Sequence, residues 1–297
     1  MELMNLSDKI NIKLTNFSIF EKYILINCLV FAVISITNAL YFLFTDQHLT
    51  FFYNYIALPE DVSKFLTRPW TIFTYFFTHF GFRHLFYNII GLYFFGRIFM
   101  TFYDSKQFIK HYLLGGIFAG FIFIISYNIF PALINKQTVL IGASASVFSV
   151  LFGATATNPN FNFNLFGVLQ IRLWVISSLY TLLFISTLPY ANSGGELAHL
   201  GGAFFGYFYA LQLKKGKDIG AGFERLMDKV VSWFQPKSSL KTVHRKKGKR
   251  EYAGKTKDEF NTFNNQKKID LILDKISKSG YESLTAEEKE FLFKTGK

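Results

Sequence analysis

The chain has 297 residues, of which 51% are hydrophobic and 38 are phenylalanine, a composition too apolar for a soluble protein that must cover its core with polar surface. The formal net charge is +12, and 21 of the 32 Lys and Arg residues lie from Lys214 onward. The first two thirds therefore predict a membrane domain, and the basic end indicates a cytoplasmic face near anionic lipid headgroups rather than a nucleic-acid-binding protein.

The N-terminal segment, residues 1–22, is polar and shows neither a cleavable signal nor a transit pattern, so we expect the first apolar segment to be retained. That segment, residues 23–44, is long enough to cross about 30 Å of hydrocarbon. Lys9, Lys13 and Lys22 precede it and place the N-terminus in the cytoplasm. Residues 45–70 are aromatic but interrupted by charges, which predicts an outer loop with interfacial helices.

Five further spans are predicted, at residues 83–103, 112–130, 144–157, 168–188 and 196–213. A turn at 104–107 separates the second span from the third, and neighbouring Arg97, Lys106 and Lys110 place it in the cytoplasm. The fourth span has only 14 residues, or about 21 Å, so its first turn is expected within the membrane near the outer surface. The prediction is an all-α, six-helix membrane domain over residues 23–214, with both termini cytoplasmic.

Residues 215–297 have the composition of a basic cytoplasmic tail. Residues 222–234 predict an amphipathic helix on the inner leaflet, and the charged run 244–250 predicts a linker. Apolar residues at helical spacing predict a helix at 266–279 that ends at Gly280. A capping box from Thr285 to Glu288 begins another short helix, so the two are expected to form a small hairpin.

Small residues dominate the stretch 141–148 at the start of the fourth span. A serine in the first turn of a helix, such as Ser144, lies among free backbone N–H groups and at the positive end of the helix dipole. This is a suitable position for a nucleophile beside an oxyanion. The same stretch is also typical of a small-residue contact between membrane helices.

Several polar residues are predicted at the same depth in the membrane as Ser144, which favours its interpretation as a nucleophile. His84 and Asn88 are four residues apart, hence on one helix face, and His199 lies one turn into the sixth span. Ionisable groups inside a bilayer are costly and suggest a functional site. His199 alone would more simply be a helix-contact histidine, but its occurrence at the depth of Ser144, His84 and Asn88 favours an activated serine.

The spacing of small residues predicts how these helices pack. Gly202 and Gly206 are four residues apart on the sixth span, a pattern that lets two helix backbones approach closely. The fourth span offers a matching stripe of small residues, namely Ala145, Ser149 and Gly153. Packing of these two faces would bring His199 toward Ser144.

Together these motifs resemble the rhomboid family of intramembrane serine proteases over most of residues 68–206. The family pattern G-x-S matches Gly142-Ala143-Ser144, and A-H-x-x-G-x-x-x-G matches Ala198-His199 with Gly202 and Gly206. The pattern H-x-x-x-N matches His84 and Asn88, and Arg68-Pro69-Trp70 also looks like the family. The segment 272–293 is similar to the ending of many bacterial members.

The resemblance implies a role for each matching residue. Ser144 would attack the scissile carbonyl, and His199 would take its proton and return it to the leaving amine. His84, Asn88 and the Ser144 backbone N–H would hold the oxyanion. Phe148 occupies the place of an aromatic ring against the histidine. The family uses a Ser-His dyad, and no acidic residue here is an obvious third member. Glu196 lies three residues before His199 on a similar helix face but is not expected to complete a triad.

One residue departs from the family pattern. Many members have glycine directly after the nucleophile, where this chain has Ala145, and a second serine, Ser146, follows. The Ala145 methyl group is expected to narrow the oxyanion pocket. Ser144 remains the predicted nucleophile because only it has Gly142 two residues before it.

The implied substrate is a transmembrane helix of another protein, which would reach the site laterally between the second and fifth spans in a bacterial inner membrane. No cofactor or metal is expected: the lone Cys28 excludes a thiolate cluster, and the spacing of His79 and His84 is poor for one helix face. One alternative is a non-catalytic rhomboid-like protein that escorts membrane clients. Another is a histidine-relay transporter, although no repeated half is present.

Overall fold

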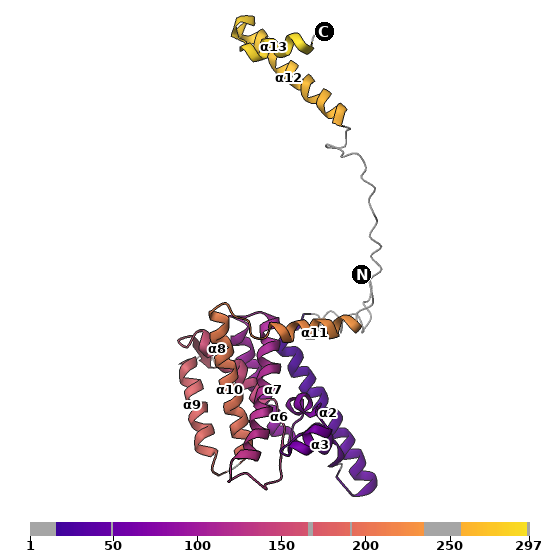
Figure 1. Cartoon of the computed structure of the whole chain (residues 1–297), viewed down its shortest axis with the longest axis vertical. Coiled ribbons are helices and arrows are strands. Elements are labelled where there is room, and N and C mark those ends of the chain that lie inside the picture. Colours follow the sequence, from indigo (N-terminus) through magenta and orange to yellow (C-terminus); the bar gives the residue numbers. More distant parts are fainter. Residues whose placement is uncertain (1–15, 49, 166–168, 191, 235–256, 296–297) are drawn as a thin grey trace. The chain divides into compact units, whose positions relative to one another are not determined.

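The computed structural model describes residues 16–48, 50–165, 169–190, 192–234 and 257–295. These residues form two compact units, one within residues 16–234 and one within residues 257–295. The first unit is a helical bundle that also contains two short strand pairs, and the second is a small helical unit (Figure 1). The N-terminal residues up to 15 and the charged run 244–250 lie outside the described residues.

The bundle begins with α2, Ile19–Thr45, which starts where the Ser18 backbone N–H donates to the Glu21 carboxylate at 2.7 Å. It ends at Asp46, which has a left-handed φ of 54°. Within the described residues, α2 and α7, Ser105–Ile129, are the two helices that are both long and apolar enough to cross a membrane. The first predicted span therefore corresponds to α2, which begins four residues earlier than expected.

Short elements follow α2, as the predicted outer loop suggested: α3, Thr50–Ile56; α4, Val62–Thr67; α5, Thr71–Thr74; and the 3-10 turn η1, Tyr75–Phe77. Between α3 and α4, β1, Leu58–Pro59, pairs antiparallel with β2, Val139–Leu140. The Trp70 indole donates to the Tyr55 carbonyl at 2.8 Å and holds this segment together. The strand pair fixes the chain just before α8.

Helix α8, Ser144–Thr157, is the centre of the bundle and has the predicted bounds. It contacts α6, Gly81–Phe99; α7; α9, Leu173–Thr187; and α10, Ser193–Lys214. Most of its side chains are buried. A short helix surrounded on all sides gives its first turn a fixed position among the neighbouring helices.

For two of the predicted boundaries that are wrong, the structure shows the physical reason. Asp104 accepts a hydrogen bond from the Gln107 backbone N–H at 2.8 Å, so the predicted turn at 104–107 is instead the N-cap and first turn of α7. The fifth helix begins at Leu173 rather than at residue 168, because β3, Asn162–Leu165, and β4, Leu169–Arg172, form an antiparallel hairpin before it.

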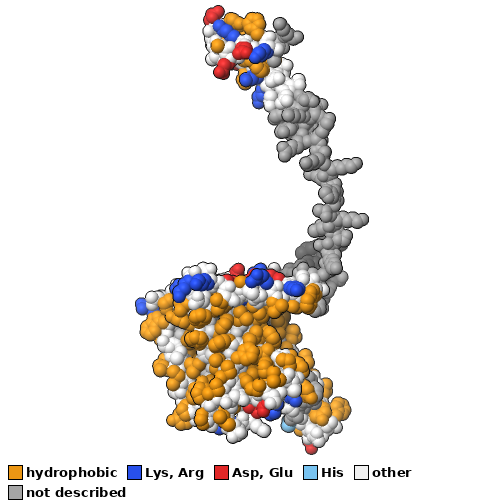
Figure 2. Space-filling model, in the orientation of Figure 1, with side chains coloured by type: hydrophobic (Ala, Val, Ile, Leu, Met, Phe, Trp, Pro, Cys, Tyr) orange, Lys and Arg blue, Asp and Glu red, His pale blue; other side chains and the backbone are white. Residues whose placement is uncertain are grey.

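The bundle exposes a broad apolar surface. Hydrophobic side chains cover its visible flank in Figure 2. On α2, Leu29 and Val33 are 55% and 60% exposed, and on α9 Leu179 and Leu182 are similarly open. Water-soluble proteins rarely expose contiguous apolar surface of this extent, whereas lipid accepts it without cost. The surface is that of a membrane protein.

An ion-pair cluster attaches α11, Ala221–Phe234, to the start of α7. The Lys110 ammonium lies 2.6 Å from a carboxylate oxygen of Asp218 and 2.6 Å from one of Glu224, although its side chain is only 2% exposed. Lys106 forms a second pair with Glu224 at 2.6 Å. Both acidic partners keep some contact with solvent. The amphipathic helix expected at 222–234 is therefore present, and α7 determines its position.

Replacing Lys110 with methionine is expected to lower the free energy of unfolding by about 2 kcal/mol, because it removes the cation shared by two carboxylates. Burial works to raise the pKa of the Asp218 carboxyl, but hydrogen bonds from Lys110, Tyr209 and Gln107 outweigh it and lower the pKa from 3.8 to about 2. This stabilisation is present above pH 3.8 and is lost as pH falls toward 2. Thermal unfolding in detergent across this range measures both effects.

Lys64→Met is the matched control for this experiment. Lys64 pairs with Glu60, four residues before it, at 3.5 Å, and its own side chain is 48% exposed. Pairs of this kind contribute about 0.5 kcal/mol or less. Equal destabilisation by the two variants would contradict a structural role for the buried cluster.

The second unit consists of α12, Lys257–Ser279; the 3-10 turn η2, Tyr281–Ser283; and α13, Ala286–Thr295. The predicted capping box is confirmed: the Thr285 N–H donates to the Glu288 carboxylate at 2.8 Å, and the Glu288 N–H donates to the Thr285 hydroxyl at 3.3 Å. Gly280, with φ of 77°, ends α12 as expected. The start predicted at 266 is wrong by nine residues.

Candidate active site

The loop before α8 requires glycine at one position. Gly142 has φ of 108°, and its N–H donates to the Tyr75 carbonyl at 2.9 Å. A Cβ at this position would lie against the imidazole of His84. Since a side chain here is excluded both by the backbone conformation and by the His84 ring, the glycine lets the chain pass close to His84 and enter α8 at Ser144.

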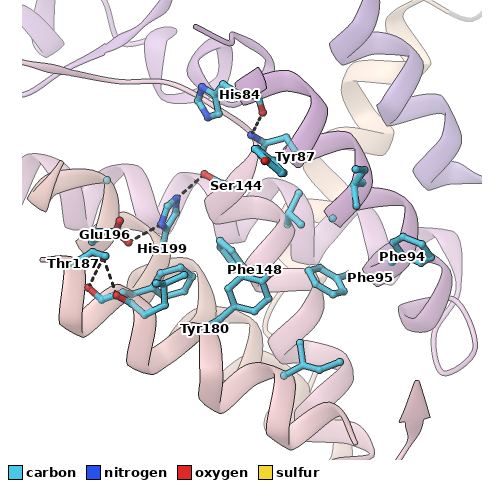
Figure 3. A pocket seen from close by; sticks show the side chains of 18 of the residues that line it. His84, Tyr87, Phe94, Phe95, Ser144, Phe148, Tyr180, Thr187, Glu196 and His199 are labelled. Carbon is cyan, nitrogen blue, oxygen red and sulfur yellow. Dashed lines mark hydrogen bonds and ion pairs between the residues drawn. The ribbon is translucent and has the colours of Figure 1, made fainter. Parts of the chain in front are cut away.

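Ser144 and His199 lie in contact. The Ser144 Oγ is 2.7 Å from His199 Nε2, and the two residues come from the first turn of α8 and the second turn of α10 (Figure 3). As the first residue of α8, Ser144 has an N–H with no carbonyl four residues back within the helix. The structure thus joins a hydroxyl, an imidazole nitrogen and the N-terminus of a helix at one point.

Two aromatic rings confine the imidazole. The Phe148 ring centroid lies 5.2 Å from that of His199, where the sequence placed an aromatic ring against the histidine. Phe184, on α9, lies closer, at 4.9 Å, and was not anticipated. Nothing in its sequence surroundings distinguishes Phe184 from the other phenylalanines of an apolar span. Together the rings restrict rotation of His199 away from Ser144.

Close packing of α8 against α10 maintains this contact. A Cβ at Gly202 would overlap the carbonyl oxygen of Ala145, and one at Gly206 would overlap that of Ser149. Side chains larger than hydrogen at these two positions would therefore push the helix backbones apart. Gly153, predicted as part of the same stripe, instead faces the His111 ring of α7.

His84 and Asn88 lie beside the serine, but the Asn88 amide does not point toward it. Asn88 Nδ2 donates to the His84 carbonyl at 2.9 Å, within α6. Asn88 Oδ1 is buried and has no hydrogen-bond partner among the described residues. His79 accepts a long hydrogen bond of 3.4 Å from the Ala143 N–H and lies edge-on to the His84 ring. The histidine pair therefore supports the loop that carries Ser144.

Ser144 and His199 face a cavity of about 660 Å³ between α6 and α9. The polar part of its wall is formed by His84, Asn88, Ser144, Thr187, Asn192, Glu196 and His199. The remaining lining is largely aromatic and aliphatic, and Figure 3 shows Tyr87, Phe94, Phe95, Phe148 and Tyr180 around it. A cavity of this kind suits an extended, largely apolar chain whose reactive bond lies at the polar end.

The neighbours of Ser144 face away from the cavity. Ser146 is fully buried, and its hydroxyl lies against Gly116 of α7. The Ala145 backbone packs on Gly202 of α10. Neither residue belongs to the described lining of the cavity, so the expected narrowing of an oxyanion pocket by the Ala145 methyl group has no counterpart in this geometry.

An acidic group lies on the other side of the imidazole. The Glu196 carboxylate is 3.2 Å from His199 Nδ1, and in Figure 3 it lies opposite Ser144 across the ring. The spacing of three residues predicted both side chains on a similar helix face, but a triad role for Glu196 was not expected. Among the described residues, no group of three His, Cys, Asp or Glu side chains is arranged to hold a metal ion.

Comparison with known families identifies two segments. The family model for the Rhomboid domain matches residues 66–216, just over half of the chain. A family of unknown function, DUF6576, matches residues 258–294, which cover most of α12 through α13. A search of curated proteins finds no match.

Proposed function

The chain belongs to the rhomboid family, and from this premise we propose that it is an intramembrane serine endopeptidase that uses a Ser144–His199 dyad. The observation that carries the proposal is the 2.7 Å contact between Ser144 Oγ and His199 Nε2 at the polar end of the cavity. A serine with an imidazole in hydrogen-bond reach is an activated nucleophile.

The proposed reaction proceeds in two halves. His199 Nε2 takes the Ser144 proton as Oγ attacks the scissile carbonyl, and the resulting tetrahedral intermediate collapses when His199 protonates the leaving amine. Water then attacks the acyl-enzyme, with His199 again acting as base. The acid product leaves, and Ser144 regains its proton.

The Ser144 backbone N–H and His84 are the proposed donors to the oxyanion, each worth about 3 to 4 kcal/mol in the transition state. His84 lines the cavity together with Ser144. Asn88 would have to release the His84 carbonyl before its amide could join them. Asn88 is therefore proposed as a supporting donor that acts only once substrate is bound.

We further propose six membrane crossings by α2, α6, α7, α8, α9 and α10, with residues 1–22 and 215–297 in the cytoplasm of a bacterium. The basic residues near the ends of these helices support this orientation through the positive-inside rule. Ser144 would then lie near the outer surface of the inner membrane. The basic residues of the tail would contact anionic headgroups.

The proposed substrate is the transmembrane helix of another protein. The cavity between α6 and α9 supports lateral access, because residues of both helices line it. A helix satisfies its own backbone hydrogen bonds, so the cleaved segment must unwind before it can extend along the cavity. Small or helix-weakening residues near the outer boundary of the substrate are the expected preference.

The second candidate is a non-catalytic rhomboid-like protein that binds membrane clients. The family membership accommodates both functions. The retained Ser144 and His199, in direct contact, favour the protease.

The test is cleavage of a fluorogenic transmembrane peptide, with a small-residue cleavage segment, by the full chain in proteoliposomes. The unaltered protein and Ser146→Ala are expected to cleave it, because Ser146 is buried against α7 away from the cavity. Ser144→Ala is expected to be inactive. Cleavage that persists unchanged in Ser144→Ala, or no cleavage by any form, would overturn the proposed function.

A further inference from the structure

We propose that Glu196 is a positioning residue for His199, so that this chain works with a Ser144–His199–Glu196 triad rather than a dyad. The inference rests on the proposed function and deepens it. Its basis is the 3.2 Å contact between the Glu196 carboxylate and His199 Nδ1, on the side of the imidazole opposite Ser144 (Figure 3).

The backbone of α10 holds the side chains of Glu196 and His199 next to each other. Glu196 lies in the first turn of α10, three residues before His199, so both side chains emerge on adjacent turns of one rigid helix. The Glu196 side chain is 17% exposed and that of His199 is 19% exposed. Glu196 also lies at the N-terminal end of α10, where the helix dipole interacts favourably with acidic side chains.

The contact determines which nitrogen of His199 carries the proton. To act as a base toward Ser144, Nε2 must present a lone pair, so the proton of the neutral ring must be on Nδ1. Glu196 provides the acceptor for that Nδ1–H. After proton transfer, the imidazolium lies between the serine oxygen and a carboxylate, which stabilises the charge that develops during the reaction.

Of the helices packed on α10, α7 carries charged side chains, and its Lys106 and Lys110 are paired with Asp218 and Glu224. Helices α8 and α9 contain no Asp, Glu, Lys or Arg, and the titratable side chain of α9 facing the cavity is Tyr180. His84 of α6 lies on the same cavity wall, and Tyr127 of α7 contacts Gly194 near the start of α10. Glu196 is thus the single acidic side chain among the described residues that line the cavity.

The experiment compares the pH dependence of kcat/KM for the full chain and Glu196→Gln on the same fluorogenic peptide. Glutamine keeps the shape and offers an amide oxygen to Nδ1–H, but it removes the charge. The plateau is expected to fall about 100-fold. The acid limb is expected to move about one pH unit lower, because the carboxylate no longer favours the imidazolium. Glu196→Asp should restore part of the plateau and move the limb back.

Glu60→Gln is the matched control, since it removes a buried glutamate that belongs to the outer segment and pairs with Lys64. It is expected to leave both the plateau and the acid limb in place. A Glu196→Gln profile identical to that of the unaltered protein would overturn the triad while leaving the protease intact. A lowered plateau with an unmoved acid limb would also overturn it, because a structural defect alone gives that result. Absence of cleavage by the unaltered protein would overturn both proposals.

Discussion

Replacing His199 with alanine is expected to lower the rate of transmembrane-peptide cleavage by about 10,000-fold or more. The imidazole is the group that accepts the Ser144 proton at 2.7 Å, and no other imidazole of the described residues hydrogen-bonds to that hydroxyl. Without it, the hydroxyl is a weak nucleophile and the leaving amine receives no proton. The effect should appear in single-turnover rates, because chemistry rather than binding is lost.

Two observations make this result specific to catalysis. The His199 ring packs between Phe148 and Phe184, so its loss leaves a small cavity but removes no backbone contact. The unfolding temperature in detergent should therefore change little compared with the loss of rate. His48→Ala is the control, because His48 is exposed and stacks on Phe42, away from the cavity. A His199→Ala protein that retains more than a tenth of the rate would contradict the dyad.

Gly202→Ala is expected to reduce both stability and activity, although alanine favours helices over glycine by about 1 kcal/mol. Its methyl group would overlap the carbonyl oxygen of Ala145, which is backbone and has no rotamer to change. Helices α8 and α10 must then separate. Because Ser144 and His199 lie on these two helices, a displacement of about 1 Å is expected to cost roughly 100-fold in rate, and overpacking lowers the free energy of unfolding by about 1 to 3 kcal/mol.

Gly222→Ala provides the matched comparison. Gly222 is also a helical glycine, near the start of α11, and a Cβ at this position meets no atom within 4 Å. This substitution should leave the rate unchanged and slightly raise the unfolding temperature. Thermal unfolding and cleavage assays on both variants measure the difference. If Gly202→Ala behaved like Gly222→Ala, the close approach of α8 and α10 would not be what holds the site together.

The sequence was sufficient to predict α8 and its central contact because the signals there are local and strong. The small residues from Gly142 and the Asn158-Pro159 pair delimit a short apolar run, whose bounds match α8. The small-residue spacing of Gly202 and Gly206 then predicted which helix lies against it. His199 followed from its position on the same helix.

Other features depend on information that residue spacing does not contain. Phe184 is one aromatic residue in an apolar span, and only the packing of α9 shows that it faces His199. The direction of the Asn88 amide depends on its rotamer, which turns it toward the His84 carbonyl. The spacing of Glu196 from His199 placed both residues on a similar helix face, but spacing does not determine in which direction the carboxylate points. The hairpin of β3 and β4 was hidden because its apolar residues extended the fifth predicted span.

The most direct test of the central claim is reaction of the full chain in proteoliposomes with a fluorophosphonate probe, followed by mass spectrometry of the labelled peptide. We predict one covalent adduct on Ser144, no adduct in His199→Ala, and full labelling in Ser146→Ala. A protein that forms no adduct, or one that carries the adduct elsewhere and keeps it in Ser144→Ala, would contradict the account and favour a non-catalytic rhomboid-like function.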